Sequence, residues 1–176
     1  MRTAPERFDT ARLRAVRSST IYLELYVPFE QDERVAVWLG GVSTAEQVEQ
    51  RLARELEHWT AHGFGRWALF DRETGQFVGR GGLRVVEIEG KAEVELGYAI
   101  VAERWGQGLA TELSEAAVRI GFDELGLDEI VAFTLPNNLG SRRVMEKAGF
   151  LYEREFEWKS RPHVLYRIRK GSSSEG

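Results

Sequence analysis

EVELGYAIVAERWGQGLAT, residues 93–111, is the segment that decides the fold of this 176-residue chain. Its first half alternates in polarity, with Val94 and Leu96 on one face and Glu93 and Glu95 on the other, and this period of two predicts a β-strand. A glycine-rich turn follows and leads into an amphipathic segment. Strand, glycine turn and helix in this order predict a place where the backbone approaches a ligand closely.

The segment after the turn has an apolar stripe at helical spacing, made of Leu109, Leu113, Ala116, Ala117 and Ile120. The first amides of such a helix have no partner within it, and the helix dipole favours negative charge there. A phosphate or pyrophosphate is therefore a suitable ligand. An ordinary glycine turn would have the same composition, so this pattern alone leaves both interpretations open.

A dinucleotide-binding turn is the alternative that the spacing Gly106-x-Gly108-x-x-Thr111 suggests. That site needs a βαβ unit and an acidic residue about 20 positions further on. Glu129 lies near that distance but begins the next predicted strand, and the first half of the chain is rich in hairpins. The turn also lacks the Gly-Lys-Ser/Thr ending of a nucleotide-triphosphate loop. A nucleotide-binding oxidoreductase is thus the weaker interpretation.

The other segments predict one β-rich α/β domain over residues 1–170, followed by a flexible tail, GSSSEG, at residues 171–176. Helices are expected within residues 18–62, after residue 108 and over residues 139–148. Strands are expected at residues 10–17, in two parts of 66–86, and at 92–101, 129–135, 151–158 and 163–169.

The composition excludes several classes of function. With 24 basic and 28 acidic side chains the net charge is −4, which argues against nucleic acid as a partner, because that needs a concentrated basic face. The absence of cysteine excludes disulfide scaffolds, thiolate zinc sites and cysteine nucleophiles. His58 and His62 are four residues apart, but Trp59 stands where the metalloprotease pattern needs Glu, so no metal is expected.

The sequence also bears on location. No stretch of about 18 apolar residues could span a bilayer. The charged first residues, 1–14, contain no apolar run typical of a secretory signal. We therefore expect a soluble cytoplasmic protein without a membrane partner.

A second motif lies at residues 136–150, PNNLGSRRVMEKAGF, where Asn138 is suited to cap a helix and Ser141 falls in its first turn. Capping alone would explain both residues. Together, however, ELGYAI, WGQGLAT and NxxSxxVMEKAGF at these intervals resemble the GNAT family of N-acetyltransferases. Within that family the chain resembles the RimJ/RimL-like subgroup, which acetylates ribosomal proteins. Trp105, where most of the family has Gln or Arg, also resembles this subgroup.

The resemblance covers about Thr10 to Arg169 and implies an α/β (α+β) GNAT fold. Its sheet would be mixed, mostly antiparallel and splayed, with six to seven strands flanked by helices, and would hold acetyl-CoA in a V-shaped gap. The residues that the resemblance assigns to acetyl-CoA are Ile100, Val101 and Ala102 for the pantetheine, the amides of Gln107, Gly108, Leu109, Ala110 and Thr111 for the pyrophosphate, Asn138 for the cofactor arm, Ser141 beside the thioester sulfur, and Arg142 or Arg143 for the nucleotide phosphate.

Acetyl transfer to an amine needs a neutral nucleophile and a proton for the leaving thiolate. A terminal α-amine has a pKa of about 7.7–8.0 and lysine about 10.4, so the α-amine needs less help from a base. Glu95 is our candidate base, with Glu93 as the alternative, although both could simply face outward on a half-exposed strand. Ser141 is the candidate acid, and a backbone amide near Val101 is expected to hold the oxyanion.

The predicted function is therefore transfer of an acetyl group from acetyl-CoA to a primary amine by direct attack in a ternary complex. A protein or peptide N-terminal α-amine is the leading acceptor, as the subgroup implies. The alternatives are a small amine, such as an antibiotic or polyamine, and a non-catalytic domain of this fold that senses acyl-CoA. Relatives occur as monomers and as dimers, so a homodimer is among the assemblies that the resemblance implies.

Overall fold

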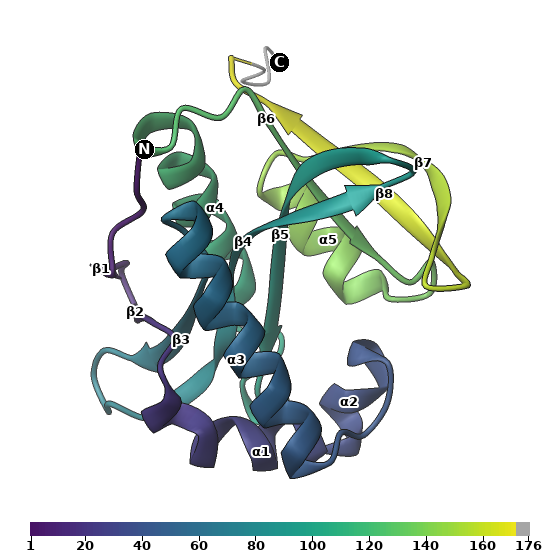
Figure 1. Cartoon of the computed structure of the whole chain (residues 1–176). Coiled ribbons are helices and arrows are strands. Elements are labelled where there is room, and N and C mark those ends of the chain that lie inside the picture. The colour runs from purple at the N-terminus through teal and green to yellow at the C-terminus, as the bar shows by residue number, and fades with distance from the viewer. Residues whose placement is uncertain (172–176) are drawn as a thin grey trace.

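Eight strands form one sheet in the computed structural model, which describes residues 1–171 (Figure 1). Their spatial order is β1-β2-β3-β4-β5-β6-β8-β7, and among these strands only β5 and β6 pair in parallel. The strands are β1 (Arg7–Asp9), β2 (Leu13–Arg17), β3 (Arg66–Asp71), β4 (Phe77–Ile88), β5 (Lys91–Ile100), β6 (Glu129–Thr134), β7 (Leu151–Trp158) and β8 (Arg161–Arg169).

This mixed, mostly antiparallel sheet confirms the predicted fold class. It has eight strands where six to seven were expected, because the short β1 pairs with β2 ahead of the first predicted strand. The predicted tail, residues 171–176, lies outside the described residues except for Gly171.

The α-helices of the described chain are α1 (Leu23–Gln31), α2 (Glu33–Leu39), α3 (Ala45–His62), α4 (Leu109–Arg119) and α5 (Leu139–Lys147). Among residues 1–171, no helix is both long and apolar enough to cross a membrane. α3 begins at a capping box formed by Thr44 and Gln47 and ends at Gly63, whose φ of 74° is left-handed. Shorter turns, Thr20–Tyr22, Ala102–Arg104 and Ile120–Glu124, connect these elements.

Helices cover both faces of the sheet (Figure 1). On β3, Ala68 packs with Tyr26 of α1 and Leu52 of α3, whereas its neighbour Leu69 belongs to the main core together with Leu113 of α4. Successive side chains of a strand point to opposite faces, so α1 and α3 lie on one face and α4 on the other. The largest buried side chains stand mainly on the α4 face.

The sheet opens between β5 and β6. β4 and β5 pair along their whole length, from Gly79 opposite Ile100 to Ile88 opposite Lys91. β5 and β6 are in register at one point only, Glu95 opposite Val131. Beyond Glu95 the two strands separate, and the C-terminal half of β5 borders a gap.

Candidate active site

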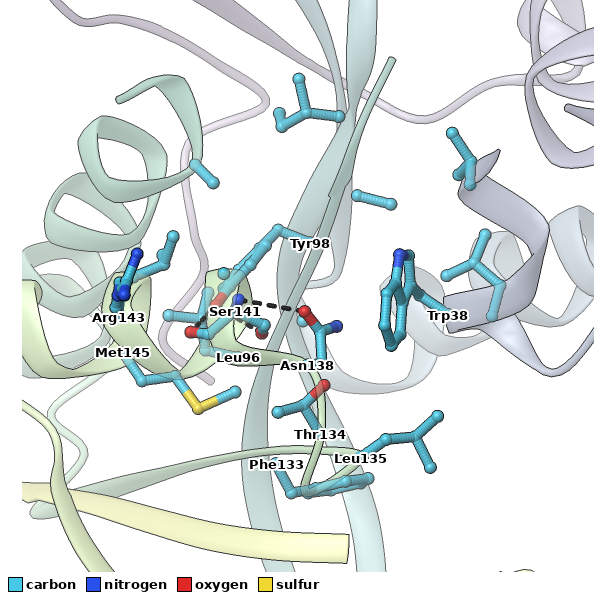
Figure 2. A pocket seen from close by; sticks show the side chains of 18 of the residues that line it. Trp38, Leu96, Tyr98, Phe133, Thr134, Leu135, Asn138, Ser141, Arg143 and Met145 are labelled. Carbon is cyan, nitrogen blue, oxygen red and sulfur yellow. Dashed lines mark hydrogen bonds between the residues drawn. The ribbon is translucent and has the colours of Figure 1, made fainter. Parts of the chain in front are cut away.

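A cleft of about 1060 Å³ lies where β5 and β6 separate. Its walls come from β5, the turn before α4, the first residues of α4, the end of β6 and α5, with α2 on the far side. Figure 2 shows Tyr98, Asn138 and Ser141 gathered at its centre, with Trp38 of α2 facing them. The two motifs that the sequence singled out, residues 93–111 and 136–150, therefore line the same cavity, each through part of its length.

The start of α4 offers amides to the cleft. Gly108 is the N-cap of α4, with a left-handed φ of 80°, and no side chain of the described residues caps this helix. The amides of Leu109, Ala110 and Thr111, which all line the cleft, lack partners within the helix. Together with the helix dipole they form a site suited to a phosphate group.

Ion pairs and hydrogen bonds hold the turn before α4. The Arg104 guanidinium contacts Asp71 Oδ2 at 2.9 Å and donates to Gln107 Oε1 at 2.8 Å. Hydrogen bonds to the Asp71 carboxylate lower its pKa to about 2; the bond from the Thr74 amide has the largest effect and the bond from Arg104 the next largest. Because the folded-state pKa is depressed, this anchor is complete above the ordinary pKa of 3.8 and is lost as the pH falls through about 2. The turn is thus held in place at neutral pH.

Tyr98, Ser141 and Asn138 form a hydrogen-bonded group. Asn138 Oδ1 accepts from the Ser141 amide at 3.2 Å, which confirms the predicted cap of α5. The Tyr98 hydroxyl donates to the Ser141 carbonyl at 3.1 Å and lies 3.0 Å from Ser141 Oγ. Burial raises the pKa of Tyr98, and the hydrogen bond with Ser141 offsets this only in part, so the phenol is protonated at neutral pH.

Sequence reasoning missed Tyr98. The signal that could have found it is the alternation of β5, which places Tyr98 on the same face as Leu96 and Ile100. Both of these residues line the cleft beside it.

The two candidate bases on β5 are both buried and ion-paired, so the alternative that both simply face outward on a half-exposed strand is wrong. Glu95 is 4% exposed and lines the cleft, and it pairs with Arg84, which stands directly opposite it on β4. Glu93 is 8% exposed and pairs with Arg167 at 3.0 Å and Lys91 at 3.0 Å. The reason is tertiary: β5 is an interior strand, and its acidic side chains are covered by Arg84 of the adjacent β4 and by Arg167 of β8, which lies beyond β6. Of these two carboxylates, Glu95 alone faces the cleft.

Replacing Glu93 by Gln is expected to lower stability without lowering the rate of acetyl transfer. Burial alone would raise the pKa of Glu93, but Arg167 and Lys91 outweigh it and lower the pKa, so the residue is a carboxylate at neutral pH. Breaking a buried ion pair costs about 3–5 kcal/mol. We expect about 2 kcal/mol here, because Arg167 keeps Glu153 and Glu129 as partners. Urea unfolding measures this loss, and an unchanged midpoint would contradict it.

The prediction of a backbone amide near Val101 for the oxyanion does not extend to the amide of Val101 itself. The Val101 amide donates to the Val78 carbonyl at 2.9 Å and is therefore occupied. Successive amides along a strand point to opposite edges of that strand. The Val101 amide points to β4, so amides one and three positions before it point away from β4. The amides of Tyr98 and Ile100 consequently face the gap.

Some residues that the resemblance assigned to acetyl-CoA lie elsewhere. Four of the assigned residues, all of which belong to the described chain, do not line the cleft: Val101, Ala102, Gln107 and Arg142. The other assigned residues do line it. Arg142 donates to the Tyr166 hydroxyl and to the Pro136 carbonyl, each at 3.0 Å. These bonds hold it on the side of α5 away from the cleft. Arg143, the alternative, lines the cleft, because one residue turns a helix by about 100°.

The two histidines of α3 are part of the packing. His58 Nε2 accepts from the Val85 amide at 2.9 Å, so His58 Nδ1 donates to the Phe64 carbonyl at 2.9 Å. Burial and the adjacent His62 lower the pKa of His58, which favours the neutral ring. Within the described residues, no three His, Cys, Asp or Glu side chains are grouped so that they could hold a metal ion.

Comparisons with known proteins agree with this geometry. Residues 11–151 match the family described as acetyltransferase (GNAT) domain. The uncharacterized protein YkkB of Bacillus subtilis is 31% identical over 161 residues, which cover 90% of this chain and 91% of that protein.

Solved structures share the fold. Ribosomal-protein-S5-alanine acetyltransferase from Vibrio fischeri superimposes with a TM-score of 0.77 at 17% identity, covering 94% of this chain and 97% of that one. Aminoglycoside acetyltransferase AAC(6')-Ib, in complex with coenzyme A, has a TM-score of 0.74 at 21% identity, covering 90% and 94%. With its sheet, its cleft and the match over residues 11–151, the chain belongs to the GNAT family of acetyltransferases.

Proposed function

We propose that this protein transfers the acetyl group of acetyl-CoA to a primary amine, and that the leading acceptor is the N-terminal α-amine of a protein or peptide. One observation carries the proposal: the gap between β5 and β6 brings together the uncapped start of α4, the Tyr98–Ser141 pair and the Glu95 carboxylate. These features supply a seat for a pyrophosphate, a proton donor and a proton acceptor in one cleft.

The cofactor-binding residues follow from this arrangement. The amides of Gly108 to Thr111 are suited to the pyrophosphate, and Ile100, at the free edge of β5, is suited to backbone pairing with the pantetheine. Asn138 lies beside Ser141 on the same wall. Arg143, rather than Arg142, is placed to meet a phosphate of the nucleotide. Acetyl-CoA supplies the activated acetyl group when bound.

In the proposed reaction, the neutral amine attacks the thioester carbonyl, and the C–N bond forms as the C–S bond breaks. The amide of Tyr98 faces the gap and is suited to bind the oxyanion. Glu95 takes the proton released by the amine, directly or through one water. Ser141, whose hydroxyl bonds with the protonated Tyr98, positions the sulfur and passes a proton to the thiolate.

The choice of acceptor rests on proton chemistry and on the subgroup resemblance. The α-amine, with a pKa of about 7.7–8.0, is partly neutral at physiological pH and needs only modest help from a carboxylate. Resemblance to the RimJ/RimL-like subgroup supports the same acceptor. A small amine is the second candidate, favoured by the shared fold with an aminoglycoside acetyltransferase. A non-catalytic sensor of acyl-CoA would keep the cleft but show no turnover.

Release of coenzyme A from acetyl-CoA, followed with a thiol-reactive dye, is the test of this function. The absence of cysteine means that the protein adds no thiol background. We expect release with peptides that have free N-termini, and little release with N-terminally blocked peptides that contain lysine. Release with aminoglycosides or polyamines only would move the acceptor to a small amine. Tight acetyl-CoA binding without release on any amine would favour the sensor.

Four proposals on domain organisation, location and partners accompany this function. One sheet includes strands from residue 7 to residue 169, which supports a single domain over residues 1–170. The sequence, with its net charge of −4 and no apolar run typical of a secretory signal, supports a cytoplasmic location without a nucleic-acid partner, and the family resemblance supports a homodimer. Light scattering of the purified protein measures the assembly state.

A further inference from the structure

Four arginines form one wall of the cleft on the α3 side of the sheet. We name this group the arginine wall; its members are Arg51 of α3, Arg66 of β3, and Arg80 and Arg84 of β4, and all four line the cleft. Three glutamates pair with them, namely Glu30, Glu55 and Glu95. The local charge is therefore one positive unit in a chain whose net charge is −4.

Two glycines let the wall reach the point where the sheet opens. Gly82 of β4 stands opposite Gly97 of β5, and Arg66 of β3 stands opposite Gly82. With no side chain at either glycine, the Arg66 guanidinium extends across β4. A Cβ at Gly97 would lie 3.0 Å from Arg66 Nη2 and 3.7 Å from Glu95 Oε1. The Arg66 guanidinium thus lies beside the candidate base, next to the gap.

The wall lies on the acceptor side of the cleft. The side chain of Glu95 points to the face of the sheet that carries α3, and a Cβ at Gly97 would point the same way. The side chain of Tyr98 points to the opposite face, where its hydroxyl contacts Ser141 of α5. Our proposed seat for acetyl-CoA is on that opposite face, at α4 and α5. An amine that attacks the thioester must come from the side that acetyl-CoA does not fill, which is the side of the arginine wall.

The wall has more donors than its glutamates use. Arg80 is 5% exposed, and Arg66 and Arg80 share one oxygen, Glu55 Oε1, at 3.1 and 3.3 Å. Within the described chain, the buried Nε atoms of Arg66 and Arg80 have no hydrogen-bond partner. Burial, with the positive charges of Arg84 and Arg80, lowers the pKa of Arg66 to about 10. These are the properties of a cationic site that lacks one anion.

We propose that the acceptor carries a carboxylate close to its amine, and that Arg66 binds this carboxylate while the amine faces Glu95. A guanidinium is planar and matches a carboxylate with two parallel hydrogen bonds. The carboxylate has two possible sources: the side chain of an acidic N-terminal residue of a peptide, or the α-carboxylate of a free amino acid. This inference rests on the proposed acetyl transfer and specifies its acceptor.

Matched substrates test the proposal on the unaltered protein. One pair is a peptide that begins with Asp and the same peptide beginning with Asn; the other is glycine and glycinamide. We expect kcat/KM, calculated for the neutral form of each amine, to be at least about tenfold higher for the charged member of the pair that supplies the natural source, as for a charge-assisted hydrogen bond. Equal values in both pairs, with acetyl transfer taking place, would overturn the proposal but leave the proposed function intact. No transfer to any amine would instead remove the proposed function, and this inference with it.

Arg66→Gln should abolish the preference for the charged substrate: the ratio of kcat/KM for the charged substrate to kcat/KM for its uncharged partner should fall about tenfold, whatever the absolute rate of the variant. Arg54→Gln is the matched control. Arg54 lies on the exposed side of α3, so this substitution removes the same charge outside the arginine wall. An equal loss in both variants would mean that overall charge sets the preference and would overturn the role of Arg66. If Arg66→Gln fails to fold, Arg66→Lys keeps the charge without the planar fork and is expected to weaken the preference.

Discussion

Replacing Gly108 by valine is expected to weaken acetyl-CoA binding about tenfold to a hundredfold while leaving the fold intact. Gly108 has a φ of 80°, a left-handed conformation that a β-branched side chain adopts only with strain. Such strain costs about 1–3 kcal/mol, and each 1.4 kcal/mol corresponds to about tenfold in affinity. The loop would relieve the strain by moving, and the amides of Leu109 to Thr111 would then no longer converge on one phosphate. Gly108 is exposed, so the core is not disturbed.

Calorimetric titration with coenzyme A measures the effect directly. Gly90→Val is the matched control, because Gly90 has the same φ of 80° in the turn between β4 and β5, outside the cleft, and a Cβ there would have only its chain neighbours within 4 Å. This control should bind coenzyme A like the unaltered protein. If Gly108→Val also binds normally, the pyrophosphate lies elsewhere in the cleft.

Changing Glu95 to Gln together with Ser141 to Ala is expected to lower kcat by about a hundredfold or more, the usual contribution of general acid–base groups. Glu95 is the only acidic side chain of the described residues that lines the cleft, and Ser141 lies at the hydroxyl of Tyr98. Neither change removes an amide at the start of α4. Affinity for coenzyme A should therefore stay within about threefold of its original value, which separates chemistry from cofactor binding.

The pH dependence of the Glu95→Gln variant identifies the role of the carboxylate. Without a base, the rate should follow the fraction of neutral amine and rise with pH through about 7.7–8.0. Glu93→Gln is the control on the same strand and should keep the rate, since Glu93 pairs with Arg167 outside the cleft. If Glu95→Gln transfers acetyl groups at the original rate at every pH, Glu95 is not the base.

Local patterns in the sequence were sufficient for most of the fold and for part of the site. The alternation of residues 93–96 predicted β5, and Gly108 marked the start of α4. Asn138 predicted the cap of α5, which the structure confirms. Each of these features depends on residues within one turn or one strand of each other, so the physics that produces them can be read along the chain.

The partners of the site residues depended on the tertiary structure. Tyr98 and Ser141 are 43 residues apart, and Glu93 and Arg167 are 74 apart, so no local period joins them. Periodicity predicted that Glu93 and Glu95 share a face, but the register of β4 and β8 decided that arginines cover that face. Local sequence patterns alone therefore predicted all the strands except β1, the end of α3 at Gly63, the start of α5 at Asn138 and the glycine turn before α4. Only the packing of distant strands decided which carboxylate faces the cleft and which arginine reaches it, because strand register and burial are set by contacts far apart in the chain.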